Sequence, residues 1–260
     1  MSNLQFDPRL SRQIEAVYTT PDVIEQRRAV RYALALRPGD RVLDVGVGPG
    51  LLAAEMAEEI GPEGRICGID ISESMLAIAA TRAQVPGGPV IELELAPATR
   101  LPFGPASFDV VVSTQVFEYV DDVAGALAEA RRVLRPGGRV VLLDTDWESV
   151  VWRSRDGERM RRVLTAFEEH LSDPHLPRTL GETLEMAGFT VTHRQVVPML
   201  NAGYDPWTYS VGLVDIIAAF VSGRSGVTPA EAEAWADDLR SFGRGYFFSL
   251  NRYLFVAVAL

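Results

Sequence analysis

The segment RVLDVGVGPG, residues 41–50, combines a short apolar run, a carboxylate and three glycines. Its first five residues have the length and apolar character of a buried strand. Gly46, Gly48 and Gly50 follow at every second position, and residues 51–60 have the Ala/Leu/Glu-rich composition of a helix. A strand, a glycine turn and a helix in this order are the elements of a nucleotide-binding unit. The segment therefore indicates the first strand of a parallel sheet and its ligand-facing loop.

The alternation of strand and helix patterns continues after this segment. The further strand patterns are residues 65–70, 89–96, 107–114, 139–145, 189–197 and 246–259. Helices between successive strands imply crossover connections and a mostly parallel sheet that is covered on both faces. We therefore predict a doubly wound α/β fold with a sheet of seven strands.

Two regions outside this alternation also have helical patterns. Residues 22–36 have a helical pattern before the first strand, and two helical segments within residues 200–242 precede the last strand. We expect the second pair to lie as a cap at one edge of the sheet. No repeat or low-complexity linker divides the chain, so we predict a single domain. Its expected parts are an N-terminal helical cap (1–38), a cofactor-binding core (39–147) and a substrate-side half (148–260).

The composition is that of a folded protein with an excess of acidic residues. The 260 residues are 47% hydrophobic and 23% charged, and the formal net charge is −10. The arginine pairs are scattered along the chain, so we predict no nucleic-acid partner. There is one cysteine, Cys67, and no apolar stretch reaches the length of a membrane helix. We predict a cytoplasmic protein without a membrane span.

The carboxylate and the glycine spacing distinguish between two kinds of adenosine ligand. A dinucleotide-binding loop has the spacing GxGxxG, whose third glycine would fall here on Leu51. Asp44, at the end of its strand, would repel a pyrophosphate but would suit a cationic ligand. Asp70, at the end of the next strand, can accept hydrogen bonds from ribose hydroxyls. Together these residues favour S-adenosylmethionine, which carries a sulfonium and an ammonium group, over NAD.

Four segments resemble the successive motifs of class I S-adenosylmethionine-dependent methyltransferases: VLDVGVGPG, GIDISESML, LPFGPASFDVVVSTQVFEYVDD and EARRVLRPGGRVVLLDTDW. The resemblance is to the group of small-molecule enzymes that includes those of ubiquinone and menaquinone biosynthesis, and it covers residues 37–147. It implies a Rossmann-like sheet with an antiparallel last strand. It also implies S-adenosylmethionine as cofactor, S-adenosylhomocysteine as product, and a small, apolar or aromatic acceptor that is methylated on oxygen, nitrogen or carbon.

The resemblance assigns cofactor contacts to residues that follow the strands: Asp44, Gly46, Gly48, Gly50, Asp70, Ile71 and Gln115. Asp70 would hold the ribose, Ile71 would pack on the adenine, and Gln115 would reach the methionine amino group. From their position near the N-terminus, and not from the resemblance, we expect Tyr18 and Arg27 to close over the cofactor, with Arg27 at the methionine carboxylate.

One position departs from the pattern of this family. Pro97 stands where the family usually has an acidic residue that accepts a hydrogen bond from the adenine amino group. Proline offers no side-chain acceptor, and one such hydrogen bond contributes about 0.5–1.5 kcal/mol. We expect backbone contacts from Ala98 and Thr99 in its place, and hence weaker adenine recognition.

The candidate catalytic residues lie in loops that follow the fourth and fifth strands. Methyl transfer is an in-line displacement, so the enzyme mainly positions the acceptor, and a base is needed only for a protonated, weakly acidic acceptor. We name Glu118, Asp146 and His175 as candidate bases. Each has an alternative role: Glu118 as a solvated or structural residue, Asp146 as a cap of the next segment, and His175 as part of an exposed helix end.

The three histidines do not form a metal-binding pattern. His170 and His175 have acidic neighbours but lack the i, i+4 spacing of a zinc pair, and Pro174 lies between them. We therefore predict no metal and place His170 at an exposed helix end. We treat His193 as a structural residue of a strand.

Five aromatic residues are candidates for the acceptor site: Tyr119, Trp147, Trp152, Tyr204 and Tyr209. Tyr119 and Trp147 follow strands, where the ligand crevice of an α/β sheet lies. Tyr204 and Tyr209 belong to the helical insertion and could form a lid over an apolar or aromatic acceptor. Packing of a cap helix on the sheet would use the same residues.

Three functions are compatible with these patterns to different degrees. The first is methyl transfer to a small-molecule acceptor by a monomer or homodimer. The second is a non-catalytic S-adenosylmethionine-binding module or partner subunit, which the departure at Pro97 would suit. The third is a nicotinamide-dependent oxidoreductase, which Asp44 and Leu51 disfavour. A further alternative leaves no ligand at all: the glycines form a tight turn, and Asp70 caps the helix that starts at Ser72.

Overall fold

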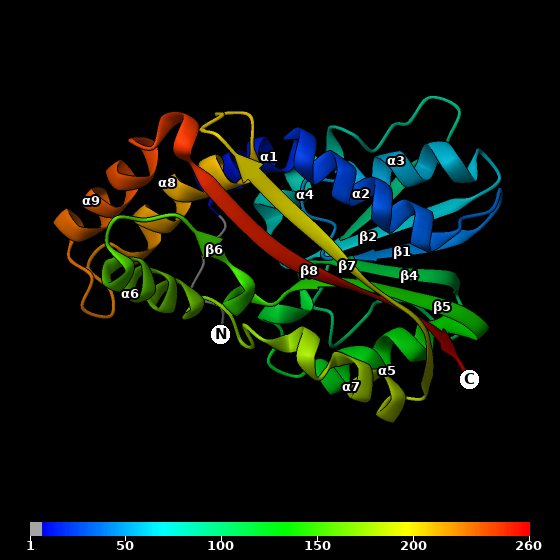
Figure 1. Ribbon diagram of the computed structural model, residues 1–260. Helices are drawn as coiled ribbons and strands as arrows, with labels where there is room; N and C mark the ends of the chain where they lie inside the picture. Colours follow the sequence, from blue (N-terminus) through cyan, green and yellow to red (C-terminus); the bar gives the residue numbers. More distant parts are fainter. Residues whose placement is uncertain (1–6) are drawn as a thin grey trace.

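The computed structural model describes residues 7–260 and contains a mixed sheet of eight strands with helices on both faces (Figure 1). The strands are β1 (Arg41–Val45), β2 (Arg65–Asp70), β3 (Ile91–Leu95), β4 (Phe108–Thr114), β5 (Leu134–Thr145), β6 (Val151–Trp152), β7 (Phe189–Ala202) and β8 (Phe247–Ala259). Their order is β3-β2-β1-β4-β5-β8-β6, and β7 also pairs with β8. The strands from β1 to β5 are parallel, whereas β8 is antiparallel to β5, β6 and β7.

This arrangement confirms the Rossmann-like, doubly wound fold with an antiparallel last strand. The sheet has one strand more than the seven we predicted. The additional strand is β6, whose two residues pair with Phe248 and Ser249 of β8. A strand of two residues is too short to produce a periodic pattern in the sequence.

The helices are α1 (Pro8–Tyr18), α2 (Pro21–Leu34), α3 (Leu51–Ile60), α4 (Glu73–Ala80), α5 (Val123–Val133), α6 (Gly157–Glu168), α7 (Leu180–Met186), α8 (Tyr209–Val221) and α9 (Pro229–Arg240). Four 3₁₀ turns join them to the sheet: η1 (Phe117–Tyr119), η2 (Trp147–Ser149), η3 (Leu176–Arg178) and η4 (Gly243–Gly245). Buried side chains of α2 and α3 form one apolar layer on the sheet, and those of α5 and α7 form the other. Within residues 7–260, no helix combines the length and apolar character that crossing a bilayer requires.

Local hydrogen bonds explain where several of these helices begin. The Ser72 hydroxyl accepts a hydrogen bond from the Met75 N–H and caps α4, which begins at Glu73. The Asp122 carboxylate caps α5 through the N–H of Gly125 at 2.8 Å. Such caps satisfy N–H groups that have no partner inside the helix, so each element starts at a defined residue.

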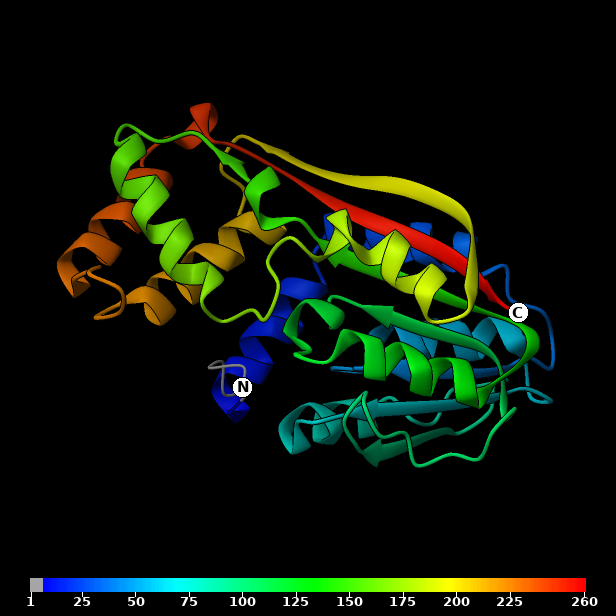
Figure 2. The same cartoon turned by 90° about the horizontal axis from the view of Figure 1, so that it is seen from below.

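The cap contains more helices than we predicted. Helices α1, α6, α8 and α9 pack together beyond the carboxyl ends of the parallel strands (Figures 1 and 2), with Trp152, Trp235 and Phe248 in their shared core. We had placed the inserted pair α8–α9 as a cap at one edge of the sheet and had not included α6. The position over the strand ends brings the cap to the edge where ligands bind in folds of this kind. The proposed boundaries between cap, core and substrate-side half stay predictions.

Candidate active site

A cavity of ≈ 280 Å³ lies where the carboxyl ends of β1, β2 and β4 meet the cap. It has two ends. The predicted residues at its sheet end are Gly46, Gly48, Asp70, Ile71, Ala98 and Gln115. The predicted residues at its cap end are Tyr18, Tyr119, Trp147 and Tyr209. The lining is mainly apolar and the cavity is continuous, so two ligands can meet inside it without intervening water.

The glycine loop admits no larger side chain at its first position. Gly46 has φ +74°, and a Cβ atom there would lie 2.2 Å from Cγ2 of Val116. Gly50 begins α3 with φ +79°, and its Cβ would lie 3.0 Å from that of Ala79. Both φ values are in the left-handed region that glycine adopts without steric cost. The loop therefore presents bare backbone to the cavity, which is the surface that a close-fitting cofactor requires.

Asp70 is held at the cavity wall by two backbone donors. Its Oδ2 accepts a hydrogen bond from the Gly48 N–H and its Oδ1 from the Ser72 N–H, each at 2.9 Å. Burial raises the pKa of Asp70, and these two backbone donors act in the opposite direction. Beside it, the Ile71 side chain is 66% exposed at the cavity lining. The Asp70 carboxylate can therefore accept hydrogen bonds from ribose hydroxyls, and the apolar Ile71 side chain beside it can pack against the base.

Asp44 lies behind the glycine loop and does not line the cavity. It is 2% exposed, and burial together with the nearby Asp70 raises its pKa to about 7. Any influence of Asp44 on a ligand in the cavity therefore acts through the field of its charge or through the loop.

Gln115 forms part of the cavity wall in a strained backbone conformation. Its φ is +56°, and its N–H donates to the Leu143 carbonyl at 2.6 Å. A left-handed conformation in a residue other than glycine costs about 1–3 kcal/mol and is concentrated at functional sites. Nearby, Ala98 lines the cavity, whereas Pro97 and Thr99 are exposed outside it.

Arg27 supports the cavity from outside. Its Nη1 donates to the Tyr18 carbonyl at 2.6 Å, and its Nε donates to Oε1 of Glu55 at 2.8 Å. The guanidinium thus connects the end of α1 to α3 and does not line the cavity. In this structure Arg27 fixes the position of Tyr18, which does line it.

The cap end of the cavity is walled by aromatic rings. The Trp147 indole meets the rings of Phe167 at 5.3 Å and His170 at 5.8 Å, and Tyr119 lies 5.6 Å from His170, between ring centroids. The prediction that His170 lies at an exposed helix end is wrong, because it is 1% exposed and lines the cavity. It follows α6 and continues the buried face of that helix.

Two of the predicted acceptor residues lie outside this wall. The Trp152 Nε1 donates to the Tyr246 hydroxyl at 2.8 Å, and its ring packs against Trp235 in the core of the cap. Tyr204 packs edge-on against Tyr246, with ring centroids 5.6 Å apart. Neither lines the cavity.

Glu118 belongs to a buried group of charges below the aromatic wall. Its Oε2 accepts hydrogen bonds from the Thr145 N–H at 3.0 Å and from the Trp147 Nε1 at 3.3 Å. Burial and the neighbouring Asp144 raise the pKa of Glu118 to about 8, and burial raises that of Asp144 to about 7. Glu118 is fully buried, so the solvated alternative is wrong. Its carboxylate holds the Trp147 ring in place.

Arg252 of β8 is a cation whose charge acts on both of these carboxylates. The sequence patterns did not single it out. It is fully buried, and its Cζ lies 4.6 Å from the centroid of the Tyr209 ring. Its charge lowers the pKa of both Glu118 and Asp144, against the larger effect of burial. An arginine within a strand pattern gives no sequence signal for this position.

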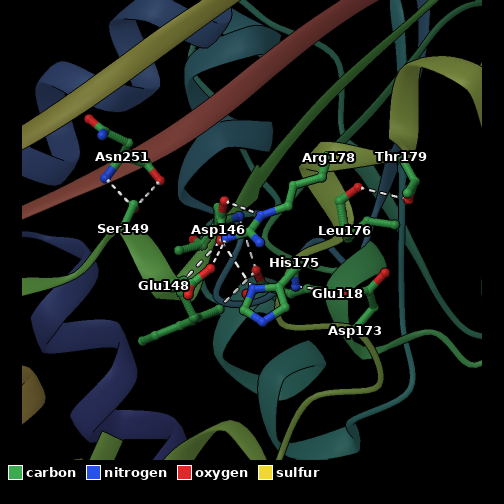
Figure 3. Close-up of polar contacts among 12 residues, drawn as sticks. Glu118, Asp146, Glu148, Ser149, Asp173, His175, Leu176, Arg178, Thr179 and Asn251 are labelled. Carbon is green, nitrogen blue, oxygen red and sulfur yellow. Dashed lines mark hydrogen bonds and ion pairs between the residues drawn. The ribbon is translucent and has the colours of Figure 1, made fainter. Parts of the chain in front are cut away.

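Asp146 and His175 form a surface network with Arg178 (Figure 3). His175 Nδ1 lies 3.1 Å from Oδ1 of Asp146, and Arg178 donates to both Asp146 oxygens at 2.8 and 3.0 Å. Although burial acts to raise it, the hydrogen bonds from Arg178 and His175 hold the pKa of Asp146 below its ordinary value. Asp146 also accepts from the Glu148 N–H, which caps η2. Neither candidate base lines the cavity.

Comparison with known proteins agrees with the observed fold. A family model described as a methyltransferase domain matches residues 43–142. The chain is 33% identical over 194 residues to the ubiquinone/menaquinone biosynthesis C-methyltransferase of Ralstonia pickettii, covering 73% of this chain and 77% of that protein. It is 34% identical over 254 residues to an uncharacterized 37.1 kDa protein of a Streptomyces fradiae transposon, covering 95% and 70%.

A solved structure shares the fold. The phosphoethanolamine N-methyltransferase 2 of Haemonchus contortus, in complex with S-adenosylmethionine, superposes with a TM-score of 0.64 at 20% identity. The superposition covers 99% of this chain and 58% of that one.

The fold, the cavity and the glycine loop are together those of a class I S-adenosylmethionine-dependent methyltransferase. Within that class, the chain belongs to the family of the ubiquinone/menaquinone biosynthesis methyltransferases. It is an enzyme whose cofactor is S-adenosylmethionine. The loop at Gly46 fits this cofactor, since any Cβ there would occupy the space of Val116 and displace the cavity wall.

Proposed function

We propose that the protein transfers the methyl group of S-adenosylmethionine by in-line displacement to an oxygen, nitrogen or carbon atom of a small, apolar or aromatic metabolite. The observation that carries this proposal is one continuous cavity, which extends from the glycine loop to the aromatic side chains of Trp147 and Tyr209. An aromatic wall favours a flat, apolar acceptor. The name of the Ralstonia pickettii relative, which refers to quinones, supports the same class of ring compound.

The proposed contribution of the cavity residues is orientation and exclusion of water. Asp70 and the glycine loop would hold the cofactor at the sheet end, and Gln115 would direct its amino group. Tyr119, Trp147 and Tyr209 would hold the acceptor ring on the other side of the methyl group. Alignment of two reactants in this way supplies most of the rate enhancement that a displacement at carbon requires.

The proposal gives no proton-transfer role to Glu118, Asp146 or His175. The Glu118 Oε2 is occupied by Thr145 and Trp147, and Asp146 is occupied by Arg178 and His175. A candidate base must come within hydrogen-bond reach of the proton that it removes, and none of the three lines the cavity.

Methyl transfer to a two-ring acceptor tests the proposal. The purified protein would be incubated with S-adenosylmethionine labelled in its methyl group and with 1,4-dihydroxynaphthalene kept reduced under argon. We expect labelled product in the organic extract, and its mass and NMR spectra would identify the methylated atom. The control is Gly46→Ala, whose cofactor site is blocked and which should therefore give no labelled product.

Failure of transfer would have a definite meaning if the cofactor still bound. Binding of S-adenosylmethionine without transfer to this acceptor or to a panel of amine and phenol acceptors would contradict the proposal. That result would favour the alternative, a non-catalytic S-adenosylmethionine-binding module or partner subunit.

A further inference from the structure

The strands β7 and β8 extend past α7 toward the cap (Figure 2). On one side of β8, Phe255 and Ala257 are buried against α5 and α7. Farther toward the cap the same side of the sheet is exposed, and we call this part the open face. Its apolar side chains come from three strands: Val151 of β6, Val196, Pro198, Leu200 and Ala202 of β7, and Phe247 of β8.

The strand register places these side chains next to one another. Val151 and Leu200 both pair with Ser249, one from each side of β8. Residues paired across antiparallel strands point to the same face, so Val151 at 54% and Leu200 at 61% exposure belong to one surface. Met199 and Leu250, the next residues in their strands, point to the opposite face and are buried. Alternate positions from 196 to 202 and from 247 to 253 carry no charged side chain, so the open face is continuous and uncharged.

The backbone of β7 disfavours addition of a further strand at its edge. Asn251 of β8 pairs with Pro198, but its N–H and its carbonyl both bond to the Ser149 hydroxyl on the side away from β7, at 3.0 and 3.3 Å. This pair is therefore not a hydrogen-bonded one, and the backbone nitrogen of Pro198 faces the free edge. Proline has no N–H to donate there, so the open face, rather than the edge, is the surface through which another molecule can bury these side chains.

The end of the open face nearest the cap is positively charged. Arg153 and Arg244 line a hollow of ≈ 670 Å³ together with Val151 and Phe247. Arg153 donates to a backbone carbonyl there, that of Gly245, at 2.9 Å, and Arg244 is exposed.

The opposite end, next to Asn251, is acidic. Asp146 and Glu148 share the guanidinium of Arg178, and the Glu148 side chain is 66% exposed (Figure 3). The hydrogen bonds between Ser149 and the Asn251 backbone fix this segment to β8. The two ends of the open face therefore carry opposite charge, on either side of an apolar centre.

We propose that the open face is the interface of a homodimer with two-fold symmetry. A two-fold axis through its centre, near Leu200, sets the arginine end of one copy on the carboxylate end of the other and brings the two apolar centres together. Each contact then occurs twice, so Arg244 of each copy meets Glu148 of the other. The open face and its charged ends comprise fewer residues than the about 20–30 per side of a standard interface, so we expect a dissociation constant in the micromolar range. This inference goes beyond methyl transfer and does not depend on the acceptor.

Sedimentation equilibrium at protein concentrations from about 1 to about 200 µM, which span the expected dissociation constant, tests the dimer. We expect the average mass to rise from 28.5 kDa toward twice that value. Leu200→Arg places two like charges together near the axis and should raise the dissociation constant at least about 10-fold. Tyr32→Arg is the matched control, because Tyr32 is 89% exposed on α2, which covers the other face of the sheet. It should dimerise like the wild type, and an unchanged melting temperature would show that both variants are folded.

Exchange of charges tests the two-fold arrangement. Arg244→Glu and Glu148→Arg, each alone, put like charges together and should each weaken the dimer about 3- to 10-fold at low salt. An equimolar mixture of these two variants should dimerise like the wild type, because every contact in the mixed dimer joins opposite charges.

Three results would overturn the proposal. The first is a monomer at every concentration, and the second is a dimer that persists unchanged in Leu200→Arg. The third is a mixture of the two charge variants that associates no better than either variant alone. Flotation of a monomeric protein with phosphatidylglycerol vesicles, lost in Leu200→Arg, would assign the open face to a lipid surface instead.

Discussion

The cofactor end of the cavity is built from residues close together in the chain, whereas the acceptor end is assembled from distant segments. Gly46, Gly48 and Asp70 lie on two neighbouring strand ends and are fixed by backbone hydrogen bonds. Tyr18, Trp147 and Tyr209 come from α1, η2 and α8 and meet only through packing of the cap.

This difference has a physical consequence for what each end tolerates. At the cofactor end, the backbone at Gly46 leaves no space for a side chain, since one added Cβ meets Val116 at 2.2 Å. Side chains at the acceptor end define a shape, and substitution of one ring by another changes that shape in small steps. We therefore expect sharp losses of function at the first end and graded changes in specificity at the second.

The largest effect is expected for Gly46→Ala. The added methyl group combines a positive φ with a clash against Val116, so we expect the affinity for S-adenosylmethionine to fall about 100-fold, measured by calorimetric titration. Gly39→Ala is the matched control, because Gly39 has φ +84° with nothing within 4 Å of its Cβ. Equal losses in the two variants would mean that backbone strain, and not the clash in the cavity wall, is responsible.

Asp70→Ala should weaken cofactor binding about 10- to 100-fold, since hydrogen bonds to a charged group contribute about 1.5–3 kcal/mol. The measurement is the affinity for S-adenosylhomocysteine. Asp122→Ala also loses a carboxylate that accepts a backbone hydrogen bond, at the start of α5, and should bind the ligand normally. If the two variants bound the ligand alike, Asp70 would only hold the N–H groups of Gly48 and Ser72.

Trp147→Phe and Trp152→Phe compare the acceptor wall with the core of the cap. Each change removes an indole N–H, which donates to Glu118 in one case and to Tyr246 in the other. We expect Trp147→Phe to weaken 1-naphthol binding about 3- to 10-fold. Trp152→Phe should lower the melting temperature and leave naphthol binding unchanged. The reverse pattern would move the acceptor site toward Trp152.

Glu118→Gln should change stability in a pH-dependent way. Because the folded-state pKa of Glu118 is raised to about 8, its contribution to stability is present at low pH and is lost as pH rises through that value. Glutamine keeps the acceptor for Thr145 and Trp147 without ionising. Relative to the wild type, the melting temperature of the variant should therefore rise between about pH 4.5, the ordinary pKa of a glutamate, and about pH 8, by about 2–4 °C for each kcal/mol.

The control for this pH dependence is the exposed Glu58 on α3. Glu58→Gln should leave the melting curves unchanged relative to the wild type at every pH. A constant gap between Glu118→Gln and the wild type would show that Glu118 does not ionise differently in the folded and unfolded states.

The sheet and the cofactor end could be predicted because their determinants are local. Alternating strands and helices imply the parallel sheet, and the spacing of Gly46, Gly48 and Asp70 places a ligand at the strand ends. The position of the cap over the strand ends and the added strand β6 depend on tertiary packing, which short-range patterns do not encode.

The acceptor end could be predicted only in part. Trp147 and Tyr209 were named from their positions after a strand and in the insertion, and both line the cavity. His170 was assigned to an exposed helix end because it lacks the i, i+4 spacing of a zinc pair with His175 and because Pro174 lies between the two histidines. A signal was present in the spacing of Met160, Val163 and Phe167, the buried face of α6, since His170 continues it at i+3.

The burial of Asp44 makes cofactor uptake an exchange of protons with the solvent. With its pKa raised to about 7, this carboxyl is partly protonated at neutral pH, and the arrival of a cation beside the loop should displace that proton. The affinity for S-adenosylmethionine should therefore rise with pH through 7. The heat of binding should vary with the ionisation enthalpy of the buffer, and Asp44→Asn should remove that variation. The ambient pH would then determine the fraction of the enzyme that has cofactor bound before an acceptor binds.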